Sequence, residues 1–309
     1  MRIAFLGTPD FAVPSLKALY AVGHDIACFT QPDRKKGRGG KVAMPEVKEA
    51  ALSLSLPVYQ FEKISCDEGV AKLREFSPEL MVTAAFGQIL TEEILNIPKH
   101  GCVNVHASLL PKYRGASPIQ QAVLNGDKVT GVTTMLTDIG LDTGDILLAR
   151  ETEIGPDETA GELFDRLAVL GAQVLTETVR LIETGNIIPV KQDASMATKC
   201  RTIKKEQGRI DFNDSAEHIH NLVRGMNPWP TAFALWQGNI IKIHKTKVRK
   251  DMAYDAAPGT CFIASPKQGL FVATGDGALE ILQLQMSGSR AMTAREFLNS
   301  KKLLNEVLS

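Results

Sequence analysis

Short apolar runs alternate with helical patterns along residues 1–107. Four runs are apolar on both faces, as in buried strands: 2–7, 24–30, 79–85 and 102–107. Three segments between them repeat apolar residues at helical spacing: 11–22, 44–55 and 67–76. Strands that alternate with helices pair in parallel through right-handed crossovers. The pattern therefore predicts an α/β fold, with a Rossmann-like, mostly parallel open sheet in the N-terminal part.

The pattern changes after residue 128. Two strands, 129–137 and 145–154, flank a loop rich in Gly and Asp, and one long amphipathic helix follows over 157–185. A helix is expected at 214–225. Two hairpin patterns come after it, at 232–248 and 269–285.

These patterns predict two domains. The first covers 1–189, and the polar, aperiodic segment 190–207 is typical of a linker. Several short strands with Gly turns then indicate that 208–309 forms a smaller, mainly β domain, an OB-like barrel.

Composition excludes several classes of protein. The chain has 309 residues, of which 44% are hydrophobic and 23% charged, as in globular proteins. No apolar run reaches the roughly 18 residues of a membrane span. The first residues, MRIAFLG, begin a strand without the features of a secretory leader, so we expect a cytoplasmic protein. The five cysteines form no CxxC pair, which argues against disulfides or a zinc cluster, and each is expected to be buried.

Charge is unevenly distributed although the formal net charge is zero. Residues 1–198 carry 19 Lys and Arg against 25 Asp and Glu, whereas residues 199–309 carry 16 against 10. A basic C-terminal part can meet a polyanion, because contacts of Lys and Arg to phosphates release counterions. An unevenly charged solvated surface explains the same counts equally well.

Asn104 and His106 are the clearest candidates for chemistry. They stand two residues apart in a predicted strand, so their side chains share one face, close to the carboxyl end of the strand. Ligands of open α/β sheets bind at that edge. An amide and an imidazole can both donate to a developing oxyanion, and the imidazole can also transfer a proton. The pair suits attack of an amine on an acyl or formyl carbon, although both side chains could equally satisfy backbone groups at a strand end.

A third residue is needed to orient the histidine. Asp142 is the best candidate, because its Gly- and Asp-rich loop can bring a carboxylate over the end of the sheet. Asp138 and Asp145 compete from the same loop, and spacing does not choose among the three.

The stretch NVHASLLPKYRGASPIQ, followed by DIGLDTGDIL, resembles the signature of the formyltransferases that use 10-formyltetrahydrofolate. The resemblance implies a catalytic trio of Asn104, His106 and Asp142, with 10-formyltetrahydrofolate as co-substrate and no metal. It also implies a folate-contacting segment, formed by Ser108, Leu109, Leu110 and Pro111.

Within this family, three further stretches are most similar to the methionyl-tRNA formyltransferases: FLGTPDFAVPSLKAL, TQPDRKKGRGGKVAMPEVKEAA and NPWPTAFA. This likeness implies formylation of the α-amino group of initiator methionyl-tRNA, to give N-formylmethionyl-tRNA for translation initiation. The partners would be that tRNA and the folate, and we expect a monomer. The alternatives are a sugar-nucleotide or glycinamide ribonucleotide formyltransferase, or an RNA-binding module without catalysis.

The basic loop 31–45 has no P-loop string, and GTPD at 7–10 lacks the dinucleotide fingerprint. By itself the loop could be a solvated basic segment. Its likeness to the family implies insertion at the acceptor end of the tRNA, with Arg38 as the functional arginine. The expected tRNA contacts are Arg34, Lys35, Lys36, Arg38 and Lys41 from the loop, and Lys245 and Lys247 from the second domain.

Overall fold

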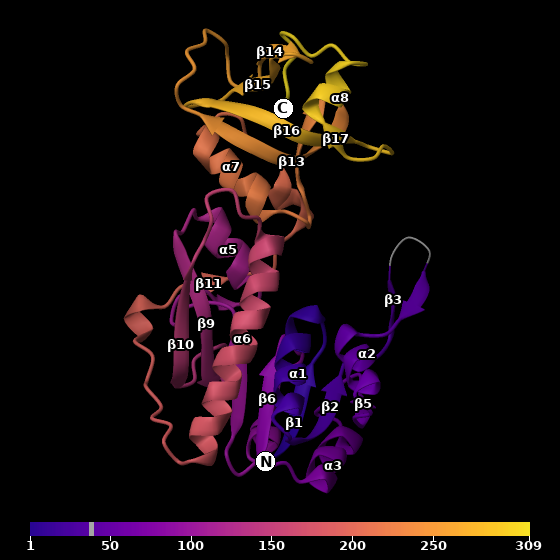
Figure 1. Cartoon of the computed structure of the whole chain (residues 1–309), viewed down its shortest axis with the longest axis vertical. Helices are drawn as coiled ribbons and strands as arrows, with labels where there is room; N and C mark the ends of the chain where they lie inside the picture. The colour runs from indigo at the N-terminus through magenta and orange to yellow at the C-terminus, as the bar shows by residue number, and fades with distance from the viewer. Residues whose placement is uncertain (37–39) are drawn as a thin grey trace. The chain divides into compact units, whose positions relative to one another are not determined.

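A computed structural model of the protein describes residues 1–36 and 40–309 (Figure 1). The chain forms two compact units whose segments interleave. The first unit consists of Met1–Pro118, Val129–Glu153 and Phe164–Cys200. The second consists of Ile119–Lys128, Ile154–Leu163 and Arg201–Ser309.

A seven-stranded sheet forms the centre of the first unit, in the order β10-β9-β7-β6-β1-β2-β5. Neighbours from β5 to β7 pair in parallel, whereas β9 runs antiparallel to both β7 and β10. The predicted Rossmann-like, mostly parallel sheet is thus confirmed. The strands are β1 (Arg2–Gly7), β2 (Asp25–Thr30), β5 (Val58–Gln60), β6 (Leu80–Ala84), β7 (Cys102–His106), β9 (Val129–Leu136) and β10 (Ile146–Glu153).

The helices bury one face each against this sheet. Pro14 lies in the first turn of α1, where its missing N–H costs no hydrogen bond. The core beside β1 contains Leu6, Phe29, Leu73 and Met81, all fully buried. The helices are η1 (Asp10–Ala12), α1 (Val13–Ala21), α2 (Glu46–Ser53), α3 (Asp67–Phe76), α4 (Glu92–Leu95) and α6 (Ala160–Glu183).

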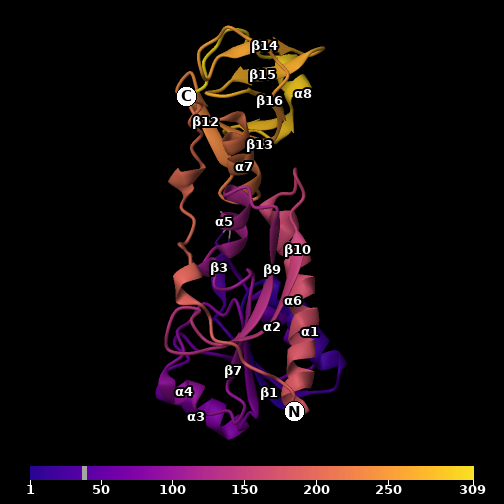
Figure 2. The ribbon, with the colours of Figure 1, turned by 90° about the vertical axis from the view of Figure 1, so that its left-hand side faces the viewer.

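Helix α6 runs beside β9 and β10 in both Figure 1 and Figure 2. A Cβ atom at Gly171 would lie 3.0 Å from Cγ1 of Val105 and 3.7 Å from that of Val132. The glycine therefore lets the helix lie close to β7 and β9. Since Val105 faces α6, the alternate residues of β7 face the other side of the sheet.

Several short elements are absent from the sequence-based expectations. Strand β5 has only three half-buried residues, too few to show a periodic pattern. In the predicted linker, β11 (Lys199–Cys200) pairs in parallel with β8 (Arg114–Gly115), so this part of the segment belongs to the first unit. The other short elements here are η2 (Ala194–Met196) and the hairpin of β3 (Arg34–Lys36) and β4 (Lys41–Ala43).

The second unit is built on antiparallel strands, as predicted for the mainly β domain. They pair in the order β12-β13-β16-β15-β14, and β17 pairs with β16. Ile219, Trp236, Ile243, Leu279 and Phe297 lie in its core. The strands are β12 (Ala232–Trp236), β13 (Asn239–Arg249), β14 (Cys261–Ser265), β15 (Gly269–Ala273), β16 (Ala278–Met286) and β17 (Met292–Thr293). The other elements are α5 (Pro118–Leu124), η3 (Lys205–Gly208), α7 (Ala216–Gly225) and α8 (Ala294–Leu298).

Four of the five cysteines are buried as expected, but the expectation was wrong for Cys66. This residue is exposed at the N-terminus of α3, where its sulfur accepts a hydrogen bond from the backbone N–H of Gly69 (3.4 Å). Across residues 1–36 and 40–309, no helix combines the length and apolar character required to cross a membrane.

Candidate active site at the end of strand β7

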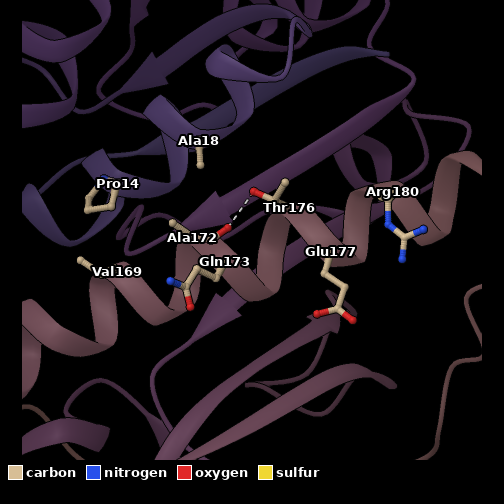
Figure 3. A pocket seen from close by; sticks show the side chains of 8 residues that line it. All are labelled: Pro14, Ala18, Val169, Ala172, Gln173, Thr176, Glu177 and Arg180. Carbon is tan, nitrogen blue, oxygen red and sulfur yellow. Dashed lines mark hydrogen bonds between the residues drawn. The ribbon is translucent and has the colours of Figure 1, made fainter.

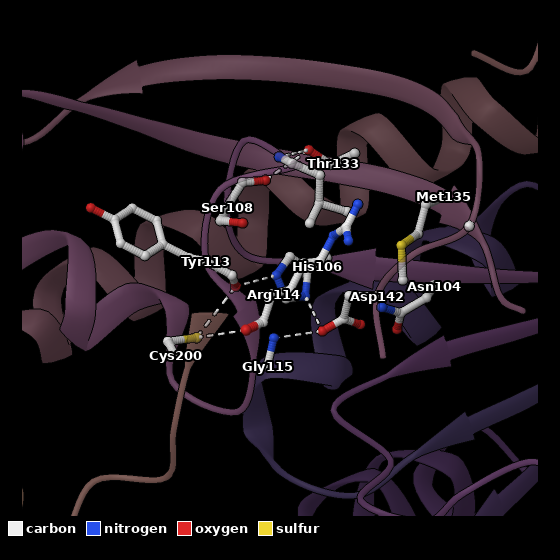
Figure 4. A network of polar contacts seen from close by, with 12 residues as sticks. Asn104, His106, Ser108, Tyr113, Arg114, Gly115, Thr133, Met135, Asp142 and Cys200 are labelled. Atoms are coloured by element: carbon white, nitrogen blue, oxygen red, sulfur yellow. Dashed lines mark hydrogen bonds and ion pairs between the residues drawn. The ribbon is translucent and has the colours of Figure 1, made fainter. Parts of the chain in front are cut away.

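Asn104 and His106 lie at the carboxyl end of β7, and Figure 4 shows their side chains. Because Val105 between them faces α6, both share the opposite face of the sheet. Asn104 is flanked by Thr83 of β6 and Met135 of β9, its register partners in the sheet. His106 is 6% exposed, and Asn104 is half-buried. The structure therefore brings the two side chains together as their spacing predicts.

Thr83 orients the amide of Asn104. The threonine hydroxyl donates a 2.9 Å hydrogen bond to Oδ1 of Asn104. Since the oxygen end of the amide is engaged there, the NH₂ end is directed away from Thr83. Asn104 thus presents a hydrogen-bond donor at the edge of the sheet.

The imidazole of His106 is held from one side by a backbone carbonyl. Its Nε2 lies 3.0 Å from the oxygen of Tyr113. A carbonyl only accepts, so Nε2 carries the hydrogen. The other ring nitrogen, Nδ1, lies 3.8 Å from Oδ2 of Asp142. Proton exchange with a substrate is therefore left to Nδ1, beside a carboxylate.

Asp142 is the aspartate of its loop that reaches His106. Its Oδ2 also accepts the backbone N–H of Gly115 at 2.7 Å, and its φ of 53° lies in the left-handed region. Asp138 instead bonds to Thr143 Oγ1 at 2.7 Å and to the N–H of Gly140 at 3.0 Å, inside the loop. The contact with His106 thus distinguishes Asp142 from Asp138, which sequence spacing alone could not do.

The predicted folate segment is largely turned inward. Ser108 is fully buried, with its hydroxyl bonded to the backbone carbonyl four residues on at 2.7 Å, and Leu110 is 7% exposed. Thr133 Oγ1 donates to the carbonyl of Ser108 (2.7 Å) and accepts from the N–H of Leu110 (3.1 Å). Leu109 and Pro111 are half-buried. Ser108 and Leu110 therefore shape the loop from inside, and the assignment of all four residues to folate stays a prediction.

Part of the predicted linker supports the site. Thr198 accepts the N–H of Tyr113 on its hydroxyl (2.8 Å) and the N–H of Arg114 on its carbonyl (2.9 Å). The thiol of Cys200 donates to the Tyr113 carbonyl at 3.3 Å. At Gly115, where φ is 121°, a Cβ atom would lie 2.1 Å from the carbonyl oxygen of Cys200. These contacts had no sequence signal other than the Gly that follows Arg114.

The basic loop forms an antiparallel hairpin, β3 with β4, in which Lys36 stands opposite Lys41 in register. Arg34 forms an ion pair with Glu62, and both side chains are exposed. At the base of the hairpin, Asp33 accepts from Lys48 Nζ at 2.8 and 2.9 Å. Hydrogen bonds from Lys48 and then from a glutamine of β5 hold the pKa of the Asp33 carboxyl below its usual range. Lys35 is exposed, and Arg38 lies outside the described residues.

Lys245 and Lys247 are both exposed on β13 of the second unit. In register they stand opposite Gln283 and Glu280 of β16. Glu280 also forms an ion pair with Arg249 at 2.7 Å. One of the two lysines expected to contact tRNA therefore has an acidic neighbour across the sheet.

A groove between α1 and α6 lies away from these residues (Figure 3). Two of its polar side chains already make hydrogen bonds within the protein. Thr176 donates to the carbonyl of Ala172 at 2.8 Å, and Glu177 accepts from Arg150 at 2.6 Å. Within the described residues, no three His, Cys, Asp or Glu side chains gather as metal ligands. The lining residues are Pro14, Ala18, Val169, Ala172, Gln173, Thr176, Glu177 and Arg180.

Comparison with known proteins shows the family of the chain. The sequence pattern of the formyl transferase family matches residues 1–179, and that of the formyl transferase C-terminal domain matches residues 202–302. A methionyl-tRNA formyltransferase of Acetivibrio thermocellus is 49% identical and one of Solibacter usitatus 50% identical, each over 98% of this chain and 97% or 96% of the relative.

Solved structures resemble the fold at lower identity. An N-formyltransferase from Helicobacter canadensis, solved with folinic acid and dTDP-3-aminofucose, superimposes with a TM-score of 0.66 at 18% identity. The match covers 94% of this chain and all of that one. With both domain patterns present and about half of its residues shared with full-length relatives, the chain belongs to the formyl transferase family.

Proposed function

We propose that the protein transfers the formyl group of 10-formyltetrahydrofolate to the α-amino group of initiator methionyl-tRNA. The product is N-formylmethionyl-tRNA, which serves translation initiation. The observation that carries the proposal is the convergence of Asn104, His106 and Asp142 at the end of β7. It occurs in a chain that is about half identical to methionyl-tRNA formyltransferases over nearly its full length.

The rim of the site suits a donor with a flat apolar ring system. Ile89, in the loop after β6, is 88% exposed, and Ile139 and Leu141, in the loop after β9, are 83% and 64% exposed. The first loop follows a strand that pairs in parallel with β7, so it leaves the sheet at the same end as His106, and the second loop contains Asp142, which reaches His106. Exposed apolar side chains beside hydrogen-bonding groups are typical of ligand sites, and folinic acid is bound in the Helicobacter canadensis neighbour. When bound, the folate supplies an activated formyl group, and we assign Ser108, Leu109, Leu110 and Pro111 to the loop that holds it.

Asn104 and His106 perform the transfer in this proposal. The amine attacks the formyl carbon, and the NH₂ group of Asn104 donates to the formyl oxygen as negative charge develops there. A second proton on Nδ1 makes the His106 ring cationic, and Asp142 stabilises that charge from 3.8 Å. This proton bonds to the oxyanion and then passes to the departing nitrogen. The attacking amine returns a proton to Nδ1, so the protons balance.

Basic residues of both units position the tRNA. We propose that Arg34, Lys35, Lys36, Arg38 and Lys41 contact its acceptor end and that Lys245 and Lys247 contact its phosphates. Such contacts orient an RNA without reading its sequence. The catalytic domain is proposed to span 1–189, joined by 190–207 to a tRNA-binding domain at 208–309. We also propose that the protein is cytoplasmic and that it is a monomer. Sedimentation of the purified protein would test whether it is a monomer.

A formylation assay tests the function directly. The protein is mixed with 10-formyltetrahydrofolate and charged initiator or elongator methionyl-tRNA, and formylmethionine is measured. We expect product with the initiator tRNA, and we expect Asn104→Ala and His106→Ala to lower single-turnover rates by about 10²- to 10³-fold. Formylation of an amino-sugar nucleotide without any tRNA product would overturn the proposal, as would wild-type rates in both variants.

A further inference from the structure

Gln192, in the predicted linker, makes four hydrogen bonds with Arg114 and two backbone carbonyls, and its Nε2 also donates a longer one to the sulfur of Met135 at 3.9 Å. Its Oε1 accepts from Nε and Nη2 of Arg114, at 3.0 and 2.7 Å. Its Nε2 donates to the backbone carbonyls of Asp142 and Gly144, at 2.9 and 2.7 Å. One amide side chain thus ties the loop after β7 to the loop after β9.

The first of these loops contacts both His106 and Asp142, and the second contains Asp142 itself. In the first, Arg114 lies between Tyr113, whose carbonyl holds Nε2 of His106, and Gly115, whose N–H holds the Asp142 carboxylate. In the second, the bonded carbonyl is that of Asp142 itself. Gln192 therefore closes a ring of contacts around the 3.8 Å gap between Nδ1 of His106 and Oδ2 of Asp142.

The chemistry of the contacts requires an amide at this position. Arg114 is 7% exposed and needs an acceptor, whereas the two carbonyls need donors. Glutamine supplies both at the ends of one side chain. A carboxylate would bind Arg114 but would repel the carbonyl oxygens, and an apolar side chain would satisfy neither partner.

We propose that Gln192 is a positioning residue for the reaction. By joining the two loops it sets the separation of His106 and Asp142, and with it the geometry in which Nδ1 exchanges its proton. The inference rests on the proposed formyl transfer, in which this pair acts on the formyl group.

Three substitutions separate positioning from simple support of Arg114. Gln192→Leu removes all four bonds, Gln192→Glu keeps only the acceptor for Arg114, and Gln192→Asn keeps both groups on a shorter side chain. The matched control is Gln173→Leu, at an exposed position of α6 in the same unit.

We expect Gln192→Leu and Gln192→Glu to lower kcat by about 10- to 100-fold, the effect of misplacing a reacting group by roughly 1 Å. KM for folate and for tRNA should stay nearly unchanged, since the substrate contacts remain. Gln192→Asn should lose less, and the control should lose nothing. A wild-type kcat in Gln192→Glu would overturn the proposal, because that variant keeps only the hydrogen bonds from Arg114 and no longer joins the two loops.

Two readouts do not depend on activity. In protein labelled with ¹⁵N-histidine, the Nδ1 resonance of His106, assigned with His106→Asn, should move in Gln192→Leu because the carboxylate has moved. Hydrogen exchange at the Gly115 amide should accelerate for the same reason. An unmoved resonance and unchanged exchange would overturn the positioning role. If wild-type protein fails to formylate methionyl-tRNA, the proposed function fails, while these two measurements still decide the role of Gln192.

Discussion

The hydroxyl of Thr83 donates a 2.9 Å hydrogen bond to Oδ1 of Asn104, across neighbouring strands of the parallel sheet. This contact decides which end of the amide faces the reaction. Thr83 takes no part in the reaction itself, but its hydrogen bond leaves the NH₂ group of Asn104 as the donor that faces the site.

Thr83→Val should slow the reaction by about tenfold, less than the loss of the Asn104 donor itself, because the amide stays but can rotate. Single-turnover formylation measures the effect. Thr30→Val is the matched control: this threonine is 2% exposed at the end of β2, and its hydroxyl has no hydrogen-bond partner among the residues that the structure describes. The control should keep the wild-type rate, and an equal loss in both variants would contradict the role of Thr83.

Asp142→Asn removes the negative charge beside Nδ1 of His106 while leaving an oxygen to accept the N–H of Gly115. We expect kcat to fall by about 10²-fold, since the cationic ring loses its partner. Asp145→Asn is the control, because the contact known for Asp145 is made by its backbone carbonyl, which accepts the N–H of Leu136. Pre-steady-state kinetics should show the loss in the chemical step, and unchanged chemistry in Asp142→Asn would exclude the pair mechanism.

Removing both Lys245 and Lys247 should raise KM for methionyl-tRNA and leave KM for the folate unchanged. Each lost phosphate contact should reduce the slope of log affinity against log salt by about 0.9, so the double variant should lose roughly 2. Titrations of tRNA binding at several salt concentrations measure this slope. Lys17→Ala with Lys99→Ala, at exposed positions of the first unit, provides a control of equal charge change. A slope equal to that of the wild type would place the tRNA elsewhere.

Burial lowers the pKa of His220 below 6.5, although hydrogen bonding to the Pro156 carbonyl and the charge of Asp157 act in the opposite direction. The unfolded chain therefore binds more protons than the folded one in mildly acidic solution. This contribution to stability is fully present above about pH 6.5 and is lost as the pH falls toward and through the folded-state value.

In His220→Asn, the free energy of unfolding should depend less on pH in this acidic range. Urea unfolding of the second unit at several pH values between about 5 and 8 checks this, with His218→Asn as the exposed control on the same helix. The free energy of unfolding of the wild type should decline more on acidification than that of His220→Asn. Parallel curves for the two proteins would rule out the assignment to His220.

Local sequence patterns were sufficient to predict the central sheet and the shared face of two site residues. Alternating buried strands and helices predicted the open parallel sheet, and a spacing of two residues in one strand placed Asn104 and His106 on one face. Such features repeat with the period of the backbone, so they are readable without knowledge of distant contacts. The family motif likewise lies in contiguous residues, and the family membership it implied is confirmed.

Contacts between distant segments required the tertiary structure. Asp142 rather than Asp138 meets His106 because of how its loop turns, and Gln192 joins two loops from a segment that shows no periodicity. The interleaving of the two units is equally invisible along the chain. The physical reason is common to all three: a hydrogen bond or ion pair depends on distance in space, whereas sequence spacing constrains distance only within one helix or strand.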